Sequence, residues 1–454
     1  MNLSVVDAKT SRAGLLRFIT AGSVDDGKST LIGRLLFESK SLFEDQVKSI
    51  RTHSSGAINF ANLTDGLRAE REQGITIDVA YRYFSTPKRR FIIADTPGHV
   101  QYTRNMVTAA SNTHLSVILI DATAGVTEQT RRHTYLTYLL GIRHLVVCVN
   151  KMDLVDYSQD VFQAIQDQFR ALAKLDDGSG IQNGDGAMFS SIDFIPISAL
   201  HGDNLVLPSQ KISWYLGPTL LSYLEDVEID VQNDGAARLP IQWVIKSANR
   251  AHEKALRGYA GQIDGGTFKV GDQVTIHPSG QLSTIKDILT FDGSLNTASA
   301  PLSVTVLLED ELDIGRGDML THRASEPHVR RDATAIVCWM NQEPLQKGRN
   351  YLIKHSVRTI RAKVSQFISL VDINSLTSAA STKESLALND IGVVSFTASS
   401  ALVYDAYSQN QLTGSFIIID ELTNATAGAG LFLDPDSLPG FVSRFEQEVR
   451  VGDD

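Results

Sequence analysis

The chain has few cysteines and no long apolar run. Its 454 residues include 2 cysteines, Cys148 and Cys338, which is too few for a disulfide framework or a cysteine metal site. Each lies in an apolar run typical of a strand, so we expect both to be buried core residues. No apolar stretch approaches the roughly 18 residues of a membrane span, and residues 1–12 lack the apolar centre of a secretory signal. These absences predict a cytoplasmic protein without membrane association.

The chain also lacks an excess of basic residues. It has 42 lysines and arginines against 52 aspartates and glutamates, which gives a net charge of −10. Proteins that grip a nucleic-acid backbone usually present a basic surface. The short cluster Lys88–Arg90 is more typical of a solvated hairpin turn. We therefore expect a protein as the main partner and no nucleic acid.

The order of apolar patterns predicts three domains, in line with a prior of about 150 residues per domain. Strands alternate with helices through residues 1–230, which predicts a doubly wound, mostly parallel α/β sheet. The polar linker Gln232–Gly235 follows. Beyond it, short alternating runs broken by turn dipeptides predict two antiparallel β-barrels, one at 236–328 and one at 329–454.

One glycine-rich stretch, Gly22–Ser29, fits the pattern G-x-x-x-x-G-K-[ST] between a predicted strand and a predicted helix. In that context the backbone N–H groups and the helix N-terminus hold a phosphate. Lys28 would add a full charge against the β- and γ-phosphates, and the Ser29 hydroxyl would bind Mg²⁺. The alternative is a glycine turn that happens to precede a lysine. The predicted nucleotide contacts are Gly22, Ser23, Val24, Asp25, Asp26, Gly27, Lys28, Ser29 and Thr30.

A second phosphate motif, Asp95–His99, directly follows a predicted strand. The Asp95 carboxylate could hold the Mg²⁺ shell, and the Gly98 N–H could meet a γ-phosphate oxygen. Thr76 ends a long polar segment, where its hydroxyl could complete the magnesium coordination while a γ-phosphate is present. His99 is the candidate for orienting the attacking water. The predicted residues are Asp95, Thr96, Pro97 and Gly98 for the nucleotide, Ser29, Thr76 and Asp95 for Mg²⁺, and His99 for catalysis.

The predicted base is guanine because of the motif Asn150–Asp153, which follows a buried strand. The Asp153 carboxylate can accept hydrogen bonds from N1–H and the 2-amino group of guanine, a donor pair that adenine lacks. Ser198 and Ala199 would supply a backbone N–H to guanine O6. The motifs occur in the order of a guanine-nucleotide switch, so we predict binding of GTP with Mg²⁺. The predicted contacts here are Asn150, Lys151, Met152, Asp153, Ser198, Ala199 and Leu200.

These motifs resemble the translational GTPase superfamily and are similar to those of elongation factor Tu. Four stretches more closely resemble the GTPase subunit of bacterial sulfate adenylyltransferases: Ala21–Leu36, Gln101–Met106, Gly414–Asp420 and Leu422–Thr426. The resemblance implies that hydrolysis of GTP drives ATP and sulfate to adenosine 5′-phosphosulfate and diphosphate. That reaction would take place on a separate, smaller catalytic subunit, the partner in a heterodimer.

The same resemblance implies a hydrophobic gate of Val24 and Ile75 in front of His99. Val100 departs from the family pattern, in which a glutamate is expected after that histidine, and the departure bears on the local hydrogen bonds and the basal hydrolysis rate. Some relatives continue into an adenylylsulfate kinase. This chain has no second G-x-x-x-x-G-K-[ST], so we expect that activity to be absent.

Two other functions share parts of this pattern. A GTP-gated translation factor, either a carrier of aminoacyl-tRNA or a release factor, would have the same motifs. A net charge of −10 suits a protein partner better than RNA. An ATPase or kinase is the third possibility, and it would leave the Asp153 carboxylate facing adenine without donors.

Overall fold

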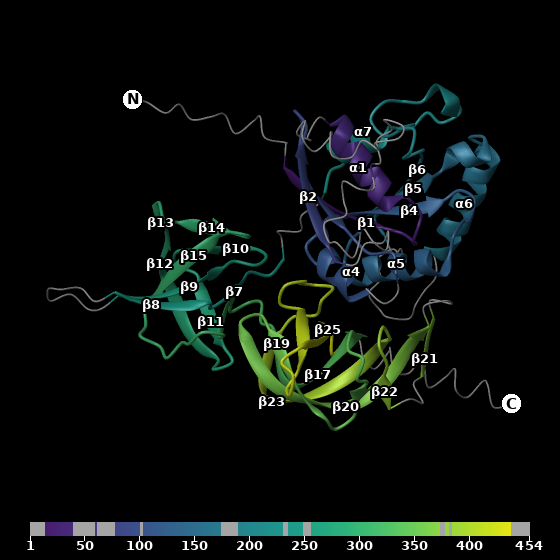
Figure 1. Cartoon of the computed structure of the whole chain (residues 1–454). Helices are drawn as coiled ribbons and strands as arrows, with labels where there is room; N and C mark the ends of the chain where they lie inside the picture. The colour runs from purple at the N-terminus through teal and green to yellow at the C-terminus, as the bar shows by residue number, and fades with distance from the viewer. Residues whose placement is uncertain are drawn as a thin grey trace, which may run out of the picture. The chain divides into compact units, whose positions relative to one another are not determined.

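The chain forms two compact units, the first of residues 1–229 and 372–377 and the second of residues 230–371 and 378–454. The described part of the first unit contains all the assigned helices, and that of the second consists of strands and loops (Figure 1). The boundaries predicted between three domains stay predictions. The computed structural model describes residues 14–39, 60, 78–99, 103–173, 189–229, 235–247, 256–372, 377–380 and 384–436.

The first unit is built on a six-stranded sheet with the order β2-β3-β1-β4-β5-β6. β2 runs antiparallel to β3, and the other neighbours are parallel. The chain therefore winds outward from β1 in both directions, as predicted for a doubly wound sheet. The strands are β1 Leu15–Ala21, β2 Ala80–Ser85, β3 Arg90–Asp95, β4 Leu115–Asp121, β5 His144–Asn150 and β6 Ser191–Pro196. The helices are α1 Lys28–Glu38, α4 Thr103–Ala110, α5 Glu128–Leu139, α6 Gln159–Leu172 and α7 Leu220–Asp226, with the short 3-10 helices η3 Met152–Val155 and η4 Gln210–Ile212.

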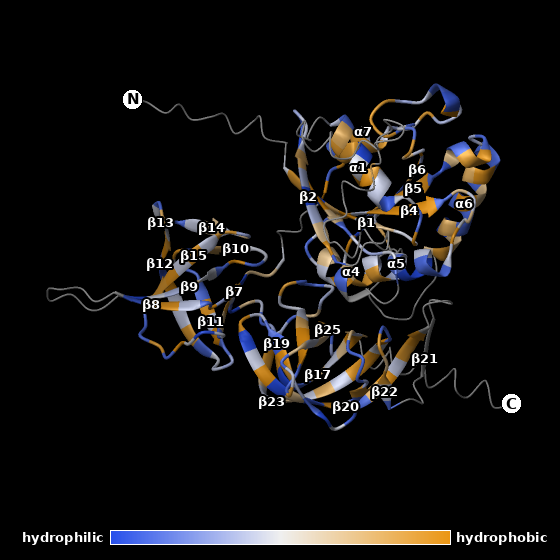
Figure 2. Ribbon diagram, in the orientation of Figure 1, coloured by the Kyte–Doolittle hydropathy of each residue, from blue (hydrophilic) through white to orange (hydrophobic). Residues whose placement is uncertain are grey.

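The core of this sheet comes from strands that are apolar on both faces. In β4 only the last residue is not fully buried, and in β5 only the first. Such burial is typical of parallel strands covered by helices, and Figure 2 shows the central strands largely in orange. Cys148 belongs to this core, and Cys338 is buried in the second unit. Both are free thiols, as predicted.

The helices differ from prediction at two places. The sequence predicts a helix near Trp214–Asp226, but α7 begins only at Leu220, with Thr219 as its N-cap. Pro218 explains the late start, because the residue before a proline is disfavoured in helical conformation. The short helix α4 has no counterpart among the elements that the sequence predicts. None of the helices in the described ranges is long and apolar enough to cross a membrane.

The second unit contains two large antiparallel sheets. The first has the order β7-β16-β11-β12-β15-β9-β8, with β13 beside β12. A backbone bridge between Arg238 of β7 and Asp264, just beyond β9, joins the two sides of this sheet. The second has the order β19-β24-β25-β17-β23-β20-β21, and β19 also pairs with β20. That extra pairing closes six strands into a barrel.

In β24 every second residue is buried, as expected for a strand with one face on the core. The first sheet consists of β7 Arg238–Pro240, β8 Trp243–Ser247, β9 Leu256–Gln262, β11 Gln273–His277, β12 Gln281–Thr290, β13 Gly293–Leu295, β15 Ser303–Leu308 and β16 Met319–His322. The second consists of β17 His328–Trp339, β19 Asn350–His355, β20 Arg358–Asp372, β21 Thr377–Ala380, β23 Ile391–Tyr404, β24 Ser415–Asp420 and β25 Thr426–Phe432. Two-stranded sheets are formed by β10 Thr267–Lys269 with β14 Thr297–Ser299, and by β18 Leu345–Gln346 with β22 Ser385–Leu386.

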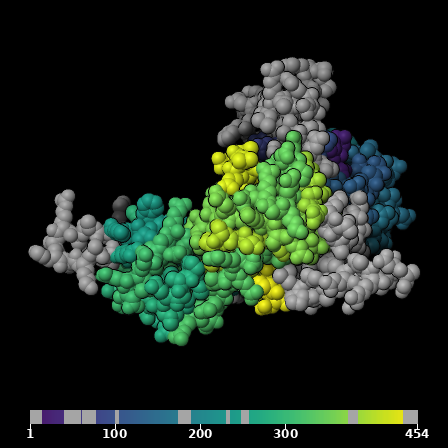
Figure 3. Space-filling view, turned by 90° about the horizontal axis from the view of Figure 1, so that it is seen from below, coloured from purple at the N-terminus to yellow at the C-terminus, as the bar shows by residue number. Residues whose placement is uncertain are grey.

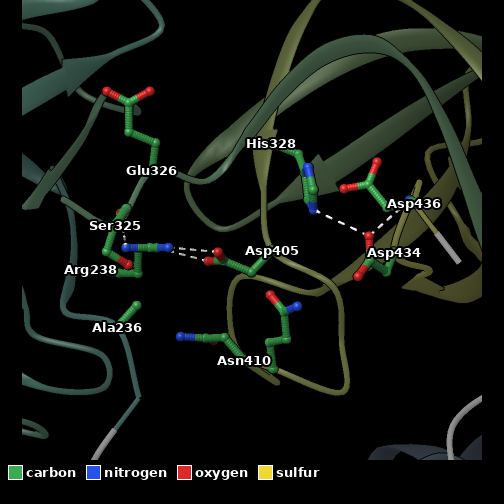
Figure 4. A pocket seen from close by; sticks show the side chains of 10 residues that line it. Ala236, Arg238, Ser325, Glu326, His328, Asp405, Asn410, Asp434 and Asp436 are labelled. Atoms are coloured by element: carbon green, nitrogen blue, oxygen red, sulfur yellow. Dashed lines mark hydrogen bonds and ion pairs between the residues drawn. The ribbon is translucent and has the colours of Figure 1, made fainter. Parts of the chain in front are cut away.

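A buried ion pair joins the two large sheets of the second unit. Arg238 donates through Nε and Nη2 to the Asp405 carboxylate at 2.9 and 2.8 Å, and the two side chains are 3% and 7% exposed. Arg238 also donates to the Ser325 carbonyl oxygen at 2.8 Å. The two residues line a cavity of about 220 Å³, and Figure 4 shows their side chains facing each other. Figure 3 shows one face of the second unit, coloured from teal through green to yellow along the chain. The pair is therefore part of the packing between the sheets.

Candidate nucleotide-binding site

The predicted motifs meet at one edge of the parallel sheet. β1, β3, β4 and β5 run in the same direction, and the register pairs Thr20 with Asp95 and Asp121 with Asn150 at their carboxyl ends. β1 lies between β3 and β4, so the strand order reverses there. In open α/β sheets ligands bind outside the carboxyl ends of the strands at such a reversal. The fold therefore places these loops where a ligand would bind.

The loop between β1 and α1 has a shape that requires glycine at both ends. Gly22 has φ 148° and Gly27 has φ 91°. A Cβ atom on Gly22 would lie 2.7 Å from the Leu119 carbonyl oxygen, and one on Gly27 would collide with the Asn150 amide. Gly27 is also the N-cap of α1. The loop therefore brings the N-terminus of a helix to the sheet edge, where an anion is stabilised.

Lys28 is held across this loop. Its Nζ donates to the Ser23 carbonyl oxygen at 2.7 Å and to the Gly22 carbonyl oxygen at 3.1 Å, and the residue is only 6% exposed. Burial lowers the pKa of the Lys28 amine, and the nearby carboxylates of Asp95 and Asp26 partly oppose that effect. The Lys28 amine is thus fixed against the backbone of Gly22 and Ser23.

Asp26 is a buried carboxyl within the same loop. It accepts the Ser23 N–H at 2.5 Å and is 4% exposed. Burial raises the pKa of Asp26 to about 6, although the positive charge of Lys28 works against the rise. A buried carboxyl with a raised pKa therefore lies inside the candidate phosphate site.

The motif after β3 packs directly on the phosphate loop. Thr20 Oγ1 donates to Asp95 Oδ1 at 3.3 Å, and Thr96 Oγ1 donates to the Thr20 carbonyl oxygen at 2.6 Å. A Cβ atom on Gly98 would lie 2.8 Å from Lys28 Nζ and 2.8 Å from the Val24 nitrogen. The close approach leaves no room for a side chain at this position.

The remaining predicted residues of this region are only partly described. His99 follows Gly98 and is exposed, and Val24 is half-buried. Thr76, Ile75 and Val100 lie outside the described residues. The magnesium role of Thr76 and the gate of Val24 and Ile75 therefore stay predictions.

Asn150 connects three loops of the site. Its Nδ2 donates to the Asp26 carbonyl oxygen at 2.7 Å, and its Oδ1 accepts the Ala199 N–H at 2.9 Å. The phosphate loop is therefore tied to both predicted guanine loops. Because the Ala199 N–H is used by Asn150 here, its contact with guanine O6 stays a prediction.

The side chains that follow Asn150 are fixed by neighbours. Lys151 Nζ donates to Asp121 Oδ2 at 2.7 Å, and Ser198 Oγ donates to Asp153 Oδ1 at 2.6 Å. Met152 is fully buried, whereas Leu200 is 61% exposed. The hydrogen bond from Ser198 thus orients the Asp153 carboxylate.

Several neighbours of the site were not predicted from the sequence. Asp121 holds Lys151, and its place at the carboxyl end of a central strand could have drawn attention to it. Arg34 of α1 donates to the His201 and Leu200 carbonyl oxygens at 2.9 and 3.3 Å. His133 of α5 accepts the Gly22 N–H at 2.9 Å. A lone histidine or arginine in a helix gives no local signal of such a role.

Two family models match the chain. The model of the elongation factor Tu GTP binding domain matches residues 14–230. The model described as GTP-eEF1A C-terminal domain-like matches residues 332–433. Together with the sheets described above, these matches confirm the predicted P-loop α/β domain followed by antiparallel β domains.

Curated relatives cover nearly the whole chain. Sulfate adenylyltransferase subunit 1 of Francisella tularensis subsp. novicida (strain U112) is 48% identical over 450 residues, which are 96% of this chain and 92% of the relative. The protein of the same name from Vibrio vulnificus (strain YJ016) is 49% identical over 92% of this chain and 86% of its own length. The bifunctional enzyme CysN/CysC of Rhodopirellula baltica is 47% identical over 97% of this chain and 66% of its own length. The chain belongs to the sulfate adenylyltransferase subunit 1 family.

Proposed function

We propose that this chain binds and hydrolyses GTP and thereby drives formation of adenosine 5′-phosphosulfate and diphosphate from ATP and sulfate on a partner subunit. One observation carries the proposal: Asn150 ties the phosphate loop to the loop expected to read guanine. In addition, the chain is 48% identical over 96% of its length to a sulfate adenylyltransferase subunit 1. That likeness favours sulfate activation over the alternative of a translation factor.

Base selection rests on the Asp153 carboxylate. A hydrogen bond from Ser198 Oγ fixes its orientation. An acceptor-only group matches the N1–H and 2-amino donors of guanine and finds no such donor pair on adenine. Lys151 is held by Asp121, which leaves its aliphatic stem to lie along the base.

Hydrolysis of GTP requires a water molecule to attack the γ-phosphorus while the bond from that phosphorus to the β–γ bridging oxygen breaks. The products are GDP, phosphate and a proton. The chain contributes mainly position and charge to such a reaction. Lys28 supplies a fixed positive charge at the loop, and the exposed His99, next to Gly98, would orient the water.

The oxygen ligands suit Mg²⁺. Hydroxyl and carboxylate oxygens are the protein ligands that this ion prefers, together with waters and phosphate oxygens. Ser29, Thr76 and Asp95 are the residues that would hold it, and Asp95 lies within the electrostatic reach of Lys28. When bound, the ion would neutralise charge on the phosphate oxygens.

We infer that the partner is a smaller catalytic subunit that binds ATP and sulfate. The name "subunit 1" of the relatives implies a second subunit. The sequence has a single G-x-x-x-x-G-K-[ST] motif, and its base loop is built for guanine. This chain alone should therefore form no adenosine 5′-phosphosulfate.

A reconstituted pair of subunits tests the proposal. The pair is given ATP and sulfate with GTP, with a non-hydrolysable GTP analogue, or without a guanine nucleotide. We expect GDP and adenosine 5′-phosphosulfate to form in parallel, and only in the reaction that contains GTP. The His99→Ala variant provides a matched control, because it should bind GTP but hydrolyse it slowly, so that product formation slows in parallel. Equal product in all three conditions would overturn the proposal.

A further inference from the structure

A buried histidine outside the predicted motifs contacts the phosphate loop. His133 lies in α5 and is 1% exposed. Its Nδ1 accepts the Gly22 N–H at 2.9 Å, although the two residues are 111 positions apart in the sequence. No other role in the proposed reaction uses this side chain.

The hydrogen bonds define the protonation state of His133. Burial lowers the pKa of its imidazole to about 3, and the positive charges of Lys28 and Arg132 act in the same direction. The ring is therefore neutral and has one N–H. Because Nδ1 accepts from Gly22, the proton is on Nε2, which lies 2.8 Å from the Gln129 side-chain amide. The structure places the Gln129 amide nitrogen beside Nε2, and a half-turn of this amide brings its oxygen there to accept the N–H.

Gly22 links His133 to Lys28. The Gly22 N–H donates to His133, and the Gly22 carbonyl oxygen accepts from Lys28 Nζ at 3.1 Å. A glycine has no side chain to limit its backbone, so these bonds are what fix its conformation. Loss of the acceptor at His133 would leave a buried N–H without a partner and release the residue that orients the lysine.

A second contact from α5 supports the same loop. Thr127, the N-cap of α5, has its Oγ1 2.7 Å from Ser23 Oγ. The same Thr127 oxygen accepts the Thr130 N–H at 3.2 Å. α5 therefore contacts two successive residues of the phosphate loop: Thr127, its N-cap, contacts Ser23, and His133 contacts Gly22.

We propose that His133 is a positioning residue for the phosphates of the nucleotide. By accepting the Gly22 N–H it holds the loop in the shape that points Lys28 at the β- and γ-phosphates, which makes α5 part of the nucleotide site. The proposal deepens the function proposed above and rests on it, since it requires that this loop binds GTP.

Substitutions that move the acceptor test this role. In His133→Asn the amide oxygen takes the place of Nδ1, whereas in His133→Gln the longer side chain presents its amide near the position of Nε2 and cannot reach Gly22 in the same way. Binding of fluorescent GDP and GTP derivatives to the full chain is measured by titration. We expect His133→Gln and His133→Leu to weaken binding by about tenfold, and His133→Asn to stay within about threefold of wild type.

Controls separate positioning from general damage. His144, whose Nδ1 lies 3.1 Å from Ser191 Oγ away from the loop, provides the matched variant His144→Asn, which should bind like wild type. Thermal unfolding without nucleotide shows whether His133→Leu still folds. If it does not, the test of the positioning role is the comparison of His133→Asn with His133→Gln. Equal affinities for these two variants, or weaker binding by His133→Asn, would overturn the positioning role alone. A wild-type chain that binds no guanine nucleotide would overturn the proposed function as well.

Discussion

At the scale of single residues, the bond from Ser198 to Asp153 gives a direct prediction about base choice. Asp153→Asn replaces a charge-assisted acceptor with a mismatched amide, so GTP binding should weaken by about 2–4 kcal/mol. The variant should prefer xanthosine triphosphate, whose 2-oxo group can accept from the new amide. Competition titrations with GTP, ATP and xanthosine triphosphate measure both effects. Equal binding of ATP and GTP by the wild type contradicts the assignment.

Asp26 predicts a pH dependence of stability. Its pKa is raised in the folded chain from 3.8 to about 6, so the folded state holds the proton more tightly than the unfolded state does. This stabilising contribution is complete below about pH 3.8 and is lost as pH rises from about 4 to 6, by about 3 kcal/mol in all. Asp26→Asn cannot lose a proton, so it should be more stable than wild type at pH 8.

Urea unfolding of both proteins at pH 5 and pH 8 measures this difference. The advantage of Asp26→Asn should be clearly smaller at pH 5. The exposed neighbour Asp25 provides the control variant Asp25→Asn, which removes a carboxyl from the same loop without removing a buried one. A difference between Asp26→Asn and wild type that stays constant with pH would contradict the prediction.

At the scale of secondary-structure elements, Asn150 is the point where three loops depend on one side chain. Asn150→Ala would leave the Asp26 carbonyl oxygen and the Ala199 N–H without their partner, at a cost of about 1–3 kcal/mol. Both the free energy of unfolding and GTP affinity should therefore fall. Asn150→Asp keeps the acceptor for Ala199, but it puts a buried carboxylate against the Asp26 carbonyl oxygen. At neutral pH it should therefore be at least as destabilising as alanine. Unchanged stability in both variants would show that the loops do not need this link.

Elements could be predicted from the sequence where a local pattern has one structural solution. The apolar runs predict strands at Leu115–Asp121 and His144–Asn150, and β4 and β5 have these bounds. Runs this short, rich in β-branched residues, favour strands buried on both faces. α7 starts later than predicted because Pro218 disfavours helical backbone at the residue before it, although apolar residues from Trp214 extend the pattern in front of the proline. The ends of a helix depend on single residues, whereas its apolar face repeats over several turns. The presence of a helix is therefore easier to predict than its first residue.

The nucleotide motifs could be predicted because each one is contiguous. Apart from Asn150 and Ser198, which belong to the motifs themselves, the residues that hold these motifs in place give little local signal in the sequence. Gly22 and His133 are 111 positions apart, and Lys151 and Asp121 are 30 apart. Only the order and register of the strands bring such pairs together. The sequence therefore predicts the groups that would touch the ligand better than the groups that position them.

At the scale of the whole molecule, the buried pair of Arg238 and Asp405 should contribute to the cohesion of the second unit. Burial alone would raise the pKa of Asp405, but the hydrogen bonds and the charge of Arg238 lower it below its ordinary value. Asp405→Ala leaves a buried guanidinium without its partner and should destabilise the unit by about 3–5 kcal/mol. The exposed pair of Lys347 and Glu384 gives the control Glu384→Ala, which should cause no measurable change.

Calorimetric unfolding of these variants measures the effect. A shift to lower temperature for the second unit in Asp405→Ala, with Glu384→Ala unchanged, supports the role of the ion pair. Equal transitions in all three proteins would mean that the sheets are held together by apolar packing alone.

The two cysteines also report separately on the two units. Cys148 lies in β5 of the first unit and Cys338 in β17 of the second. Burial raises the pKa of both thiols, that of Cys338 to about 12, so neither forms the reactive thiolate in the folded chain. Alkylation therefore requires local opening of the fold, and its rate at each sulfur measures how readily the unit that contains that cysteine opens. GTP should slow the alkylation of Cys148 and leave the alkylation rate of Cys338 unchanged. Mass spectrometry of the labelled peptides measures both rates without any engineered probe.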